Sequence, residues 1–119
     1  MSENIPVEIN LHQQSSYLTL KYSDKAFDLT AEYLRVYSPS AEVMGHRPGQ
    51  EKLQIGKEHV SIQNIVPVGN YAIQIIYDDG HDTGIYSWEY LYELGSEYSE
   101  KWNNYLHKLK KAGYERVKQ

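Results

Sequence analysis

The fold of this chain is decided by the stretch YAIQIIYDDGHDTGIYSWEYL, residues 71–91 of 119. It opens with the strongest strand pattern in the sequence, at 71–77, which is followed by a tight polar turn at 78–82. Residues 83–86 return as a partner strand. Ser87 then stands where a helix N-cap is needed. The stretch therefore predicts a β-hairpin that leads directly into a helix.

An amphipathic helical pattern follows this hairpin. Its apolar residues recur at spacings of three and four, which places them on one face of a helix. They are Leu91, Leu94, Tyr98, Trp102, Tyr105 and Leu109. Gly95 and Ser96 interrupt the pattern, and Ser96 could end one helix and cap the next. The sequence therefore predicts a C-terminal helix and leaves open a break near Gly95.

The first half of the chain repeats this plan. LKYSD (20–24) and TAEYL (30–34) parallel IIYDD (75–79) and SWEYL (87–91), with an offset of 55 residues before the turn and 57 after it. Each copy contains a strand, an acidic turn, a second strand, a hydroxyl cap and a helix. We therefore expect an α+β domain, with a small, mainly antiparallel sheet built from two hairpin–helix units and a C-terminal helix.

The length suits a single domain. The expected organisation is a flexible lead-in over 1–14, one domain over 15–112 and a frayed basic tail over 113–119. Residues 38–52 hold two Pro and two Gly and are expected to form a loop. Short strands are expected at 53–55 and 60–66.

Composition narrows the possible chemistry. The chain has no Cys, which excludes disulfides, thiolate metal sites and cysteine nucleophiles. It has neither the apolar run of a membrane helix nor the pattern of a signal peptide, so we expect a cytoplasmic protein without a membrane partner. No phosphate-cradling loop or nucleophile motif is present, so we expect no enzymatic activity.

Charge is unevenly distributed behind the net value of −4. Residues 1–100 contain six Lys or Arg and fifteen Asp or Glu, whereas residues 101–119 contain six and one. A basic tail on an acidic body is compatible with nucleic-acid binding. Because no second basic patch or stacking platform accompanies it, we expect no nucleic-acid partner. The tail cations are instead expected to complement the negative end of a helix dipole.

Four segments resemble the gamma-butyrobetaine hydroxylase-like N-terminal domain. They are 33–42 (YLRVYSPSAE), 45–46 (GH), 68–73 (VGNYAI) and 79–91 (DGHDTGIYSWEYL). The resemblance covers roughly residues 15–95 and is fairly specific because the DGH-x-x-G-I-Y-S-W run is joined to the earlier segments. It implies kinship with stand-alone bacterial proteins of uncharacterised function. The same domain stands in carnitine-biosynthesis dioxygenases and beside P-loop iron–sulfur carriers of the Mrp type.

The resemblance also implies what became of a metal site. In the dioxygenase members, three cysteines of a Cys-Pro-Cys-x-x-Cys cluster and the histidine of Asp-Gly-His hold a structural zinc. Here His81 keeps the histidine, while Ser38, Ser40 and Val43 match the cysteine positions. Two hydroxyls and a valine cannot complete a tetrahedral zinc site. We therefore expect neither that zinc nor oxygenase chemistry, since the catalytic iron lies in another domain of those enzymes.

His81 remains the most informative single residue. We expect its imidazole to hydrogen-bond the 38–43 loop and hold it mechanically, in place of the zinc. The alternative is a mixed nitrogen and oxygen site for iron or zinc, formed by His81, His46 and Asp79, with Asp82 or Glu42 as other possible oxygen donors.

The function that these features favour is a non-catalytic binding or adaptor domain with a protein partner. Twelve tyrosines and the acids near the second hairpin suggest an acidic aromatic patch. Its expected partner-binding residues are Tyr86, Trp88, Tyr90, Asp82, Glu89 and Arg35. The domain neighbours implied by the resemblance suggest a link to iron–sulfur or metal-enzyme maturation. The alternative is a metal-binding accessory protein. The sequence indicates no oligomeric state.

Overall fold

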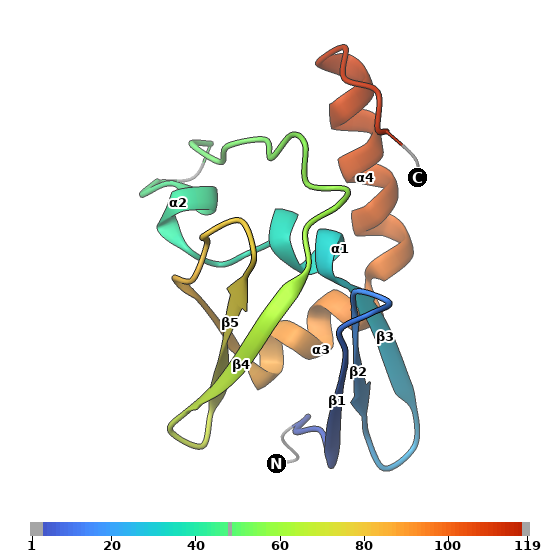
Figure 1. Cartoon of the computed structure of the whole chain (residues 1–119), viewed down its shortest axis with the longest axis vertical. Coiled ribbons are helices and arrows are strands. Elements are labelled where there is room, and N and C mark those ends of the chain that lie inside the picture. Colours follow the sequence, from blue (N-terminus) through green and yellow to red (C-terminus); the bar gives the residue numbers. More distant parts are fainter. Residues whose placement is uncertain (1–3, 48, 118–119) are drawn as a thin grey trace.

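Two similar halves and a long C-terminal helix make up the computed structural model, which describes residues 4–47 and 49–117 (Figure 1). The first half contains β1 (Glu8–His12), β2 (Tyr17–Lys21), β3 (Ala26–Thr30), α1 (Ala31–Val36) and a short α2 (Ala41–Met44). The second contains β4 (Ile62–Val68), β5 (Ala72–Tyr77), β6 (Gly84–Ser87) and α3 (Trp88–Ser96), and is followed by α4 (Tyr98–Lys111). Both sheets are antiparallel, with strand orders β1-β2-β3 and β4-β5-β6. The predicted α+β class is confirmed, with two three-stranded sheets in place of one.

The repeat seen in the sequence is a repeat in space. In the first half the amide of Ala31 donates to the carbonyl of Ser16 at 2.8 Å, and in the second the amide of Trp88 donates to the carbonyl of Tyr71 at 3.2 Å. The predicted caps are also equivalent, because the hydroxyls of Thr30 and Ser87 each accept an amide three residues along, at 3.1 Å. A side-chain oxygen in this position satisfies a backbone donor of the first helical turn.

The predicted interruption near Gly95 is a complete break. α3 ends at Ser96, and Glu97 separates it from α4. Ser96 does not cap α4, whose N-terminus has no side-chain cap. A Cβ on Gly95 would lie 2.2 Å from the ring of Phe27, so only glycine lets β3 pack against α3 here.

Several expected boundaries were wrong. The prediction of a flexible lead-in is wrong for Glu8–His12, because these residues pair with β2 as an edge strand. Residues 1–3 of the expected lead-in lie outside the described part of the chain. The expected strand at 53–55 is irregular chain, and the expected loop at 38–52 includes α2. These segments have weak patterns of their own, and contacts with the rest of the fold decide their structure.

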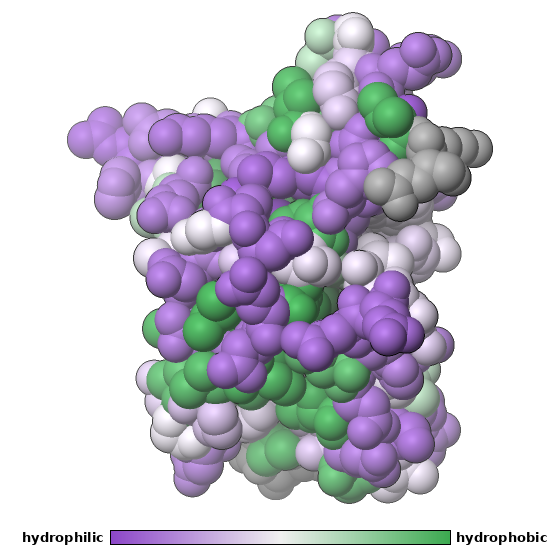
Figure 2. Space-filling model, in the orientation of Figure 1, coloured by the Kyte–Doolittle hydropathy of each residue, from purple (hydrophilic) through white to green (hydrophobic). Residues whose placement is uncertain are grey.

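The main core lies between the two sheets and the first turns of α1 and α3. It combines Leu18, Leu20 and Leu29 of the first sheet, Ile73, Ile75, Tyr77 and Tyr86 of the second, and Tyr33, Leu34, Leu91 and Leu94 of the helices. Figure 1 shows α3 between the sheets and α4 rising along one side of the molecule. On the face shown in Figure 2, hydrophobic surface gathers over the strands, and the surface above them is largely hydrophilic.

A second, smaller core attaches α4 to α1. It consists of Val36, Tyr105 and Leu109, with Leu53 and Trp102 packed against them. Within the described part of the chain, every helix is too short or too polar to span a bilayer.

The C-terminal segment is held against the domain, so the expected frayed tail is wrong for residues 114–117. The guanidinium of Arg116 binds the buried carboxylate of Glu32, with Nε 2.9 Å from Oε2, and stacks over Trp102. Tyr114 donates to Glu58 at 2.7 Å. The last two residues of the expected tail lie outside the described residues. Lys108, Lys110 and Lys111 occupy the last turn of α4, where they complement the helix dipole as expected.

Candidate functional site

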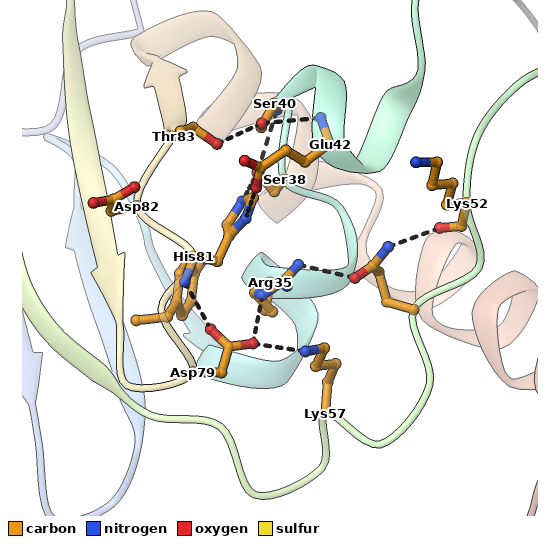
Figure 3. Close-up of polar contacts among 12 residues, drawn as sticks. Arg35, Ser38, Ser40, Glu42, Lys52, Lys57, Asp79, His81, Asp82 and Thr83 are labelled. Atoms are coloured by element: carbon orange, nitrogen blue, oxygen red, sulfur yellow. Dashed lines mark hydrogen bonds and ion pairs between the residues drawn. The ribbon is translucent and has the colours of Figure 1, made fainter.

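A buried polar cluster joins the second hairpin to the segment after α1 (Figure 3). At its centre, Nε2 of His81 lies 2.8 Å from Oγ of Ser38, and Nδ1 lies 2.9 Å from a carboxylate oxygen of Glu42. Oγ of Ser40 lies 2.6 Å from the hydroxyl of Thr83. The predicted hydrogen bonding of His81 to the 38–43 segment is confirmed: its imidazole contacts Ser38 and Glu42.

The protonation state of His81 follows from its partners. Burial and the nearby charge of Arg35 lower the pKa of His81, against the opposing effect of Glu42. A carboxylate can only accept, so Nδ1 carries the proton of the neutral ring and donates to Glu42. Nε2 is then free to accept the Ser38 hydroxyl. Both ring nitrogens are therefore engaged in hydrogen bonds.

The Ser38–His81–Glu42 arrangement has the order of a hydrolase triad, which the sequence alone did not indicate. Ser38 cannot act as the nucleophile of such a triad, because it is 0% exposed. β6 closes over it: a Cβ on Gly84 would lie 2.6 Å from Oγ of Ser38. The arrangement clamps two parts of the backbone together and gives no substrate access to the hydroxyl.

A second polar group extends from the same hairpin turn. Asp79 accepts from Nε of Arg35 at 3.0 Å, from Nζ of Lys57 at 2.7 Å and from the amide of His81 at 3.1 Å. Burial opposes ionisation of Asp79, but the hydrogen bonds from Lys57 and His81 and the charge of Arg35 outweigh it and lower its pKa to about 2. Arg35 also donates to the side chain of Gln54 at 3.1 Å. The turn is thereby tied to both α1 and the 52–57 segment.

The predicted metal ligands are not assembled into a site. His81 has both ring nitrogens engaged, and Asp79 is bound by two cations. His46 is an exposed residue on the loop after α2. Across residues 4–47 and 49–117, no three His, Asp or Glu side chains lie close enough together to hold a metal ion.

The predicted partner-binding residues divide into two groups. Tyr86 and Arg35 are wrong as surface residues, because they are 0% and 7% exposed. The hydroxyl of Tyr86 donates to the carbonyl of Leu34 at 2.7 Å and so belongs to the core. Asp82 and Glu89 are exposed, and Trp88 and Tyr90 are half-buried.

Tyr90 leads to a feature that the sequence did not indicate, a groove of about 490 Å³. We call it the α4 groove. The outer wall consists of residues 43–44 and 51–54, and the α4 wall is the face of α4 that carries Lys101, Tyr105 and Lys108; residues of α1 and α3 also line the groove. It is lined by Val36, Tyr37, Val43, Met44, Glu51, Lys52, Leu53, Gln54, Tyr90, Glu93, Lys101, Tyr105 and Lys108. A volume of this size suits a small ligand or a few side chains of a partner.

Three tyrosines give the α4 groove a fixed shape. The hydroxyl of Tyr37 donates to the carbonyl of Lys101 at 2.7 Å, and that of Tyr90 to the carbonyl of Tyr37 at 2.6 Å. The hydroxyl of Tyr105 donates to the carbonyl of Gln54 at 2.5 Å. Burial raises the pKa of Tyr37, of Tyr90 and of Tyr105. All three therefore stay protonated donors, and their rings are anchored at the polar end.

The polar cluster also fixes the outer wall of the groove. His81 and Thr83 hold Ser38, Ser40 and Glu42 at the start of α2. After α2 the chain reverses, and the amide of Lys52 donates back to the carbonyl of Val43 at 2.8 Å. The wall is thus fastened at its beginning by the second hairpin and at its end by Gln54.

Comparisons with known proteins agree with this architecture. The family described as gamma-butyrobetaine hydroxylase-like, N-terminal, matches residues 9–92. A protein with an NMR solution structure is 45% identical, with a TM-score of 0.85 over 99% of this chain and 98% of its own. A second NMR solution structure shows 43% identity and a TM-score of 0.78, and covers 96% of this chain and 91% of its own.

A crystal structure from Acidithiobacillus ferrooxidans is also similar. It is 40% identical, with a TM-score of 0.67, and covers 80% of this chain and 97% of its own. It is described as a protein of unknown function of the DUF971 family. Among curated proteins, none matches this chain closely enough to indicate a relative. The family match and the shared fold together show that this chain belongs to the gamma-butyrobetaine hydroxylase-like N-terminal family.

Proposed function

We propose that this chain is a non-catalytic binding domain that recognises another protein through the α4 groove. The observation that carries the proposal is the lining of the groove, where anchored tyrosine rings and aliphatic side chains lie between charged residues. Aromatic side chains held at their polar ends offer a large contact area without losing much conformational freedom on binding.

The polar cluster has a supporting part in this proposal. A buried Ser38 gives His81 nothing to activate for a substrate, which favours a structural role. By fixing the start of α2, the cluster holds the outer wall in position relative to α4. The groove is then preformed, and a partner does not have to order it.

The class of partner to examine first comes from the family resemblance. In related proteins this domain stands beside iron–sulfur carriers and metal-dependent dioxygenases, so we propose cytoplasmic factors that mature or deliver metal centres as the first candidates. This step is an analogy between domain neighbours and supplies no contact of its own.

The experiment compares three forms of the tagged chain as bait in an extract of the native host. Leu53→Glu places a carboxylate in the groove, and Ile55→Glu, two residues away at an exposed site outside it, is the matched control. Circular dichroism and a thermal melt first establish that all three are folded. The proposal predicts a partner retained by the native chain and by Ile55→Glu but lost with Leu53→Glu. The same retained proteins with all three baits would contradict it.

A further inference from the structure

The charges around the α4 groove restrict what its partner can be; this inference rests on the proposed function. Lysines approach the groove from both walls, Lys52 from the 43–54 segment and Lys101 and Lys108 from α4. Glu51 and Glu93 are the acids among the lining residues. The floor between these charges is apolar and aromatic.

The acidic residues that line the groove do not neutralise all of its lysines. Lys101 is neutralised within the protein, with carboxylates of Glu93 and Glu97 at 3.4 and 3.7 Å. For Lys52 and Lys108, the described residues provide no carboxylate within 4.0 Å. Glu51 offsets Lys52 on the outer wall.

The uncompensated positive charge of the lining therefore lies on the α4 wall, at Lys108. The lining residues include three Lys and two Glu, a formal charge of +1, whereas the chain as a whole has a formal net charge of −4.

The length of the groove limits the segment that fits. Lys101 and Lys108 are seven residues apart on α4, which corresponds to about 10 Å at 1.5 Å per residue. An extended peptide advances about 3.3 Å per residue, so the groove accommodates roughly three residues. In an extended segment, one side chain points to the floor while its neighbours on either side point toward the rim.

We infer that the α4 groove binds a short, extended, acidic segment of a partner protein. A bulky apolar side chain of the segment packs on the groove face of Leu53, and a flanking carboxylate pairs with Lys108. A basic segment would instead place its cations beside the lysines of the α4 wall, and like charges brought close together across an interface repel.

Three peptides test the inference: Ac-Glu-Asp-Phe-Asp-Glu-amide, the same peptide with Gly in place of Phe, and Ac-Lys-Arg-Phe-Arg-Lys-amide. Each is titrated into ¹⁵N-labelled chain, and amide shifts give both the site and the Kd. The first peptide should shift amides of residues 50–54 and 101–108. It should bind at least about tenfold tighter than the Gly peptide, because the Phe ring is withdrawn from water.

Charge reversal on α4 supplies a matched pair of variants. Lys108→Glu lines the groove, whereas Lys110→Glu makes the same change on the same helical turn at a residue that does not line it. We expect Lys108→Glu to raise the Kd of the acidic peptide by roughly threefold to tenfold. This is the effect of losing an exposed ion pair and adding repulsion. Lys110→Glu should change its Kd by less than about twofold, and added salt should weaken binding to the native chain.

The outcomes separate this inference from the proposed function. Binding of the basic peptide at the groove with equal or higher affinity overturns the acidic preference and leaves partner recognition there intact. Amide shifts outside the groove, or none at millimolar peptide, also overturn the inference. The proposed function fails independently, if Leu53→Glu retains the same proteins as the native bait.

Discussion

Tyr33 and Tyr90 occupy equivalent positions in the two halves of the fold, and each donates a hydrogen bond to the other half, Tyr33 to α3 and Tyr90 to the C-cap residue of α1. The hydroxyl of Tyr33 donates to the carbonyl of Leu94 at 2.7 Å, and that of Tyr90 donates to the carbonyl of Tyr37 at 2.6 Å. In both cases the acceptor lies four residues beyond the opposite tyrosine. The halves are therefore joined by a reciprocal pair of hydrogen bonds, and one of these tyrosines also lines the α4 groove.

Removing either hydroxyl should weaken the junction between the halves. We expect Tyr33→Phe and Tyr90→Phe each to lower the free energy of unfolding by about 1–2 kcal/mol, because a carbonyl loses its side-chain donor at a buried or half-buried site. Urea denaturation followed by circular dichroism measures the effect. Tyr71→Phe, at a side chain that is 57% exposed, is the control and should be neutral. Unchanged stability in both junction variants would show that the reciprocal bonds do not hold the halves together.

Removing the imidazole should free the outer wall of the groove. We expect His81→Ala to lower the free energy of unfolding by about 2–4 kcal/mol, since it opens a cavity and leaves the buried hydroxyl of Ser38 without its acceptor. Hydrogen exchange should accelerate at the amides of Val43 and Lys52 well before it does in β2. His107→Ala, at an exposed site on α4, is the control for loss of a histidine. An exchange pattern in His81→Ala like that of the native chain would contradict the clamp.

Stability should fall as the solution becomes mildly acidic. In the folded chain, burial and the charge of Arg35 lower the pKa of His81 below its ordinary value of 6.5. The unfolded chain therefore takes up this proton first, so the stabilisation is complete above pH 6.5 and is lost as the pH falls below that value. Urea midpoints measured from pH 8 to pH 5 should decline in the native chain and decline less in His81→Ala. Equal declines would assign the effect to other groups.

A second loss is expected at lower pH. The pKa of Asp79 is lowered from 3.8 to about 2 in the folded chain, so its contribution is present above pH 3.8 and disappears as the pH falls through 2. We expect Asp79 to contribute about 1 kcal/mol to the free energy of unfolding, allowing for solvent screening of a partly exposed carboxylate. Asp79→Asn should remove this dependence, whereas Asp82→Asn, in the same turn, should retain it. If both variants retain it, the ion pairs of Asp79 do not stabilise the fold.

The ion pair of Arg116 should hold the C-terminal segment in place. Arg116→Ala leaves the Glu32 carboxylate, whose side chain is only 8% exposed, without its cation. We expect a loss of about 2–3 kcal/mol in the free energy of unfolding. Adding Glu32→Gln should recover part of that loss, because the buried charge is then removed. A double variant less stable than Arg116→Ala would contradict the explanation.

Much of the fold could be predicted from local chemistry. The repeated Glu-Tyr-Leu after a hydroxyl residue located both helix starts, because a cap at Thr30 or Ser87 acts within one turn. β1 was missed because its own pattern is weak; it forms because Leu18 and Leu20 in β2 offer a paired neighbour. Pairing of this kind depends on the rest of the fold and cannot be seen in five residues.

The site was less predictable for a physical reason. The contact of His81 with Ser38 could be predicted only from the family resemblance. It matches both residues to ligands of one zinc site, although they are 43 positions apart in the sequence. Tyr86 was misplaced because a tyrosine has the same sequence signal whether its hydroxyl meets water or, as here, the carbonyl of Leu34. The groove could not be predicted because Leu53 and Tyr105, which both line it, are far apart in the sequence and come together only in the folded chain.

The most direct test of the central claim is photo-crosslinking in the native host at two exposed positions. Met44 lies at the α4 groove, and Tyr71 lies in the turn between β4 and β5, away from it. Benzoylphenylalanine placed at position 44 should give a discrete crosslink to one partner protein, and at position 71 it should not. Crosslinks to the same protein from position 71 alone, or equal yields from both positions, would contradict recognition through the groove.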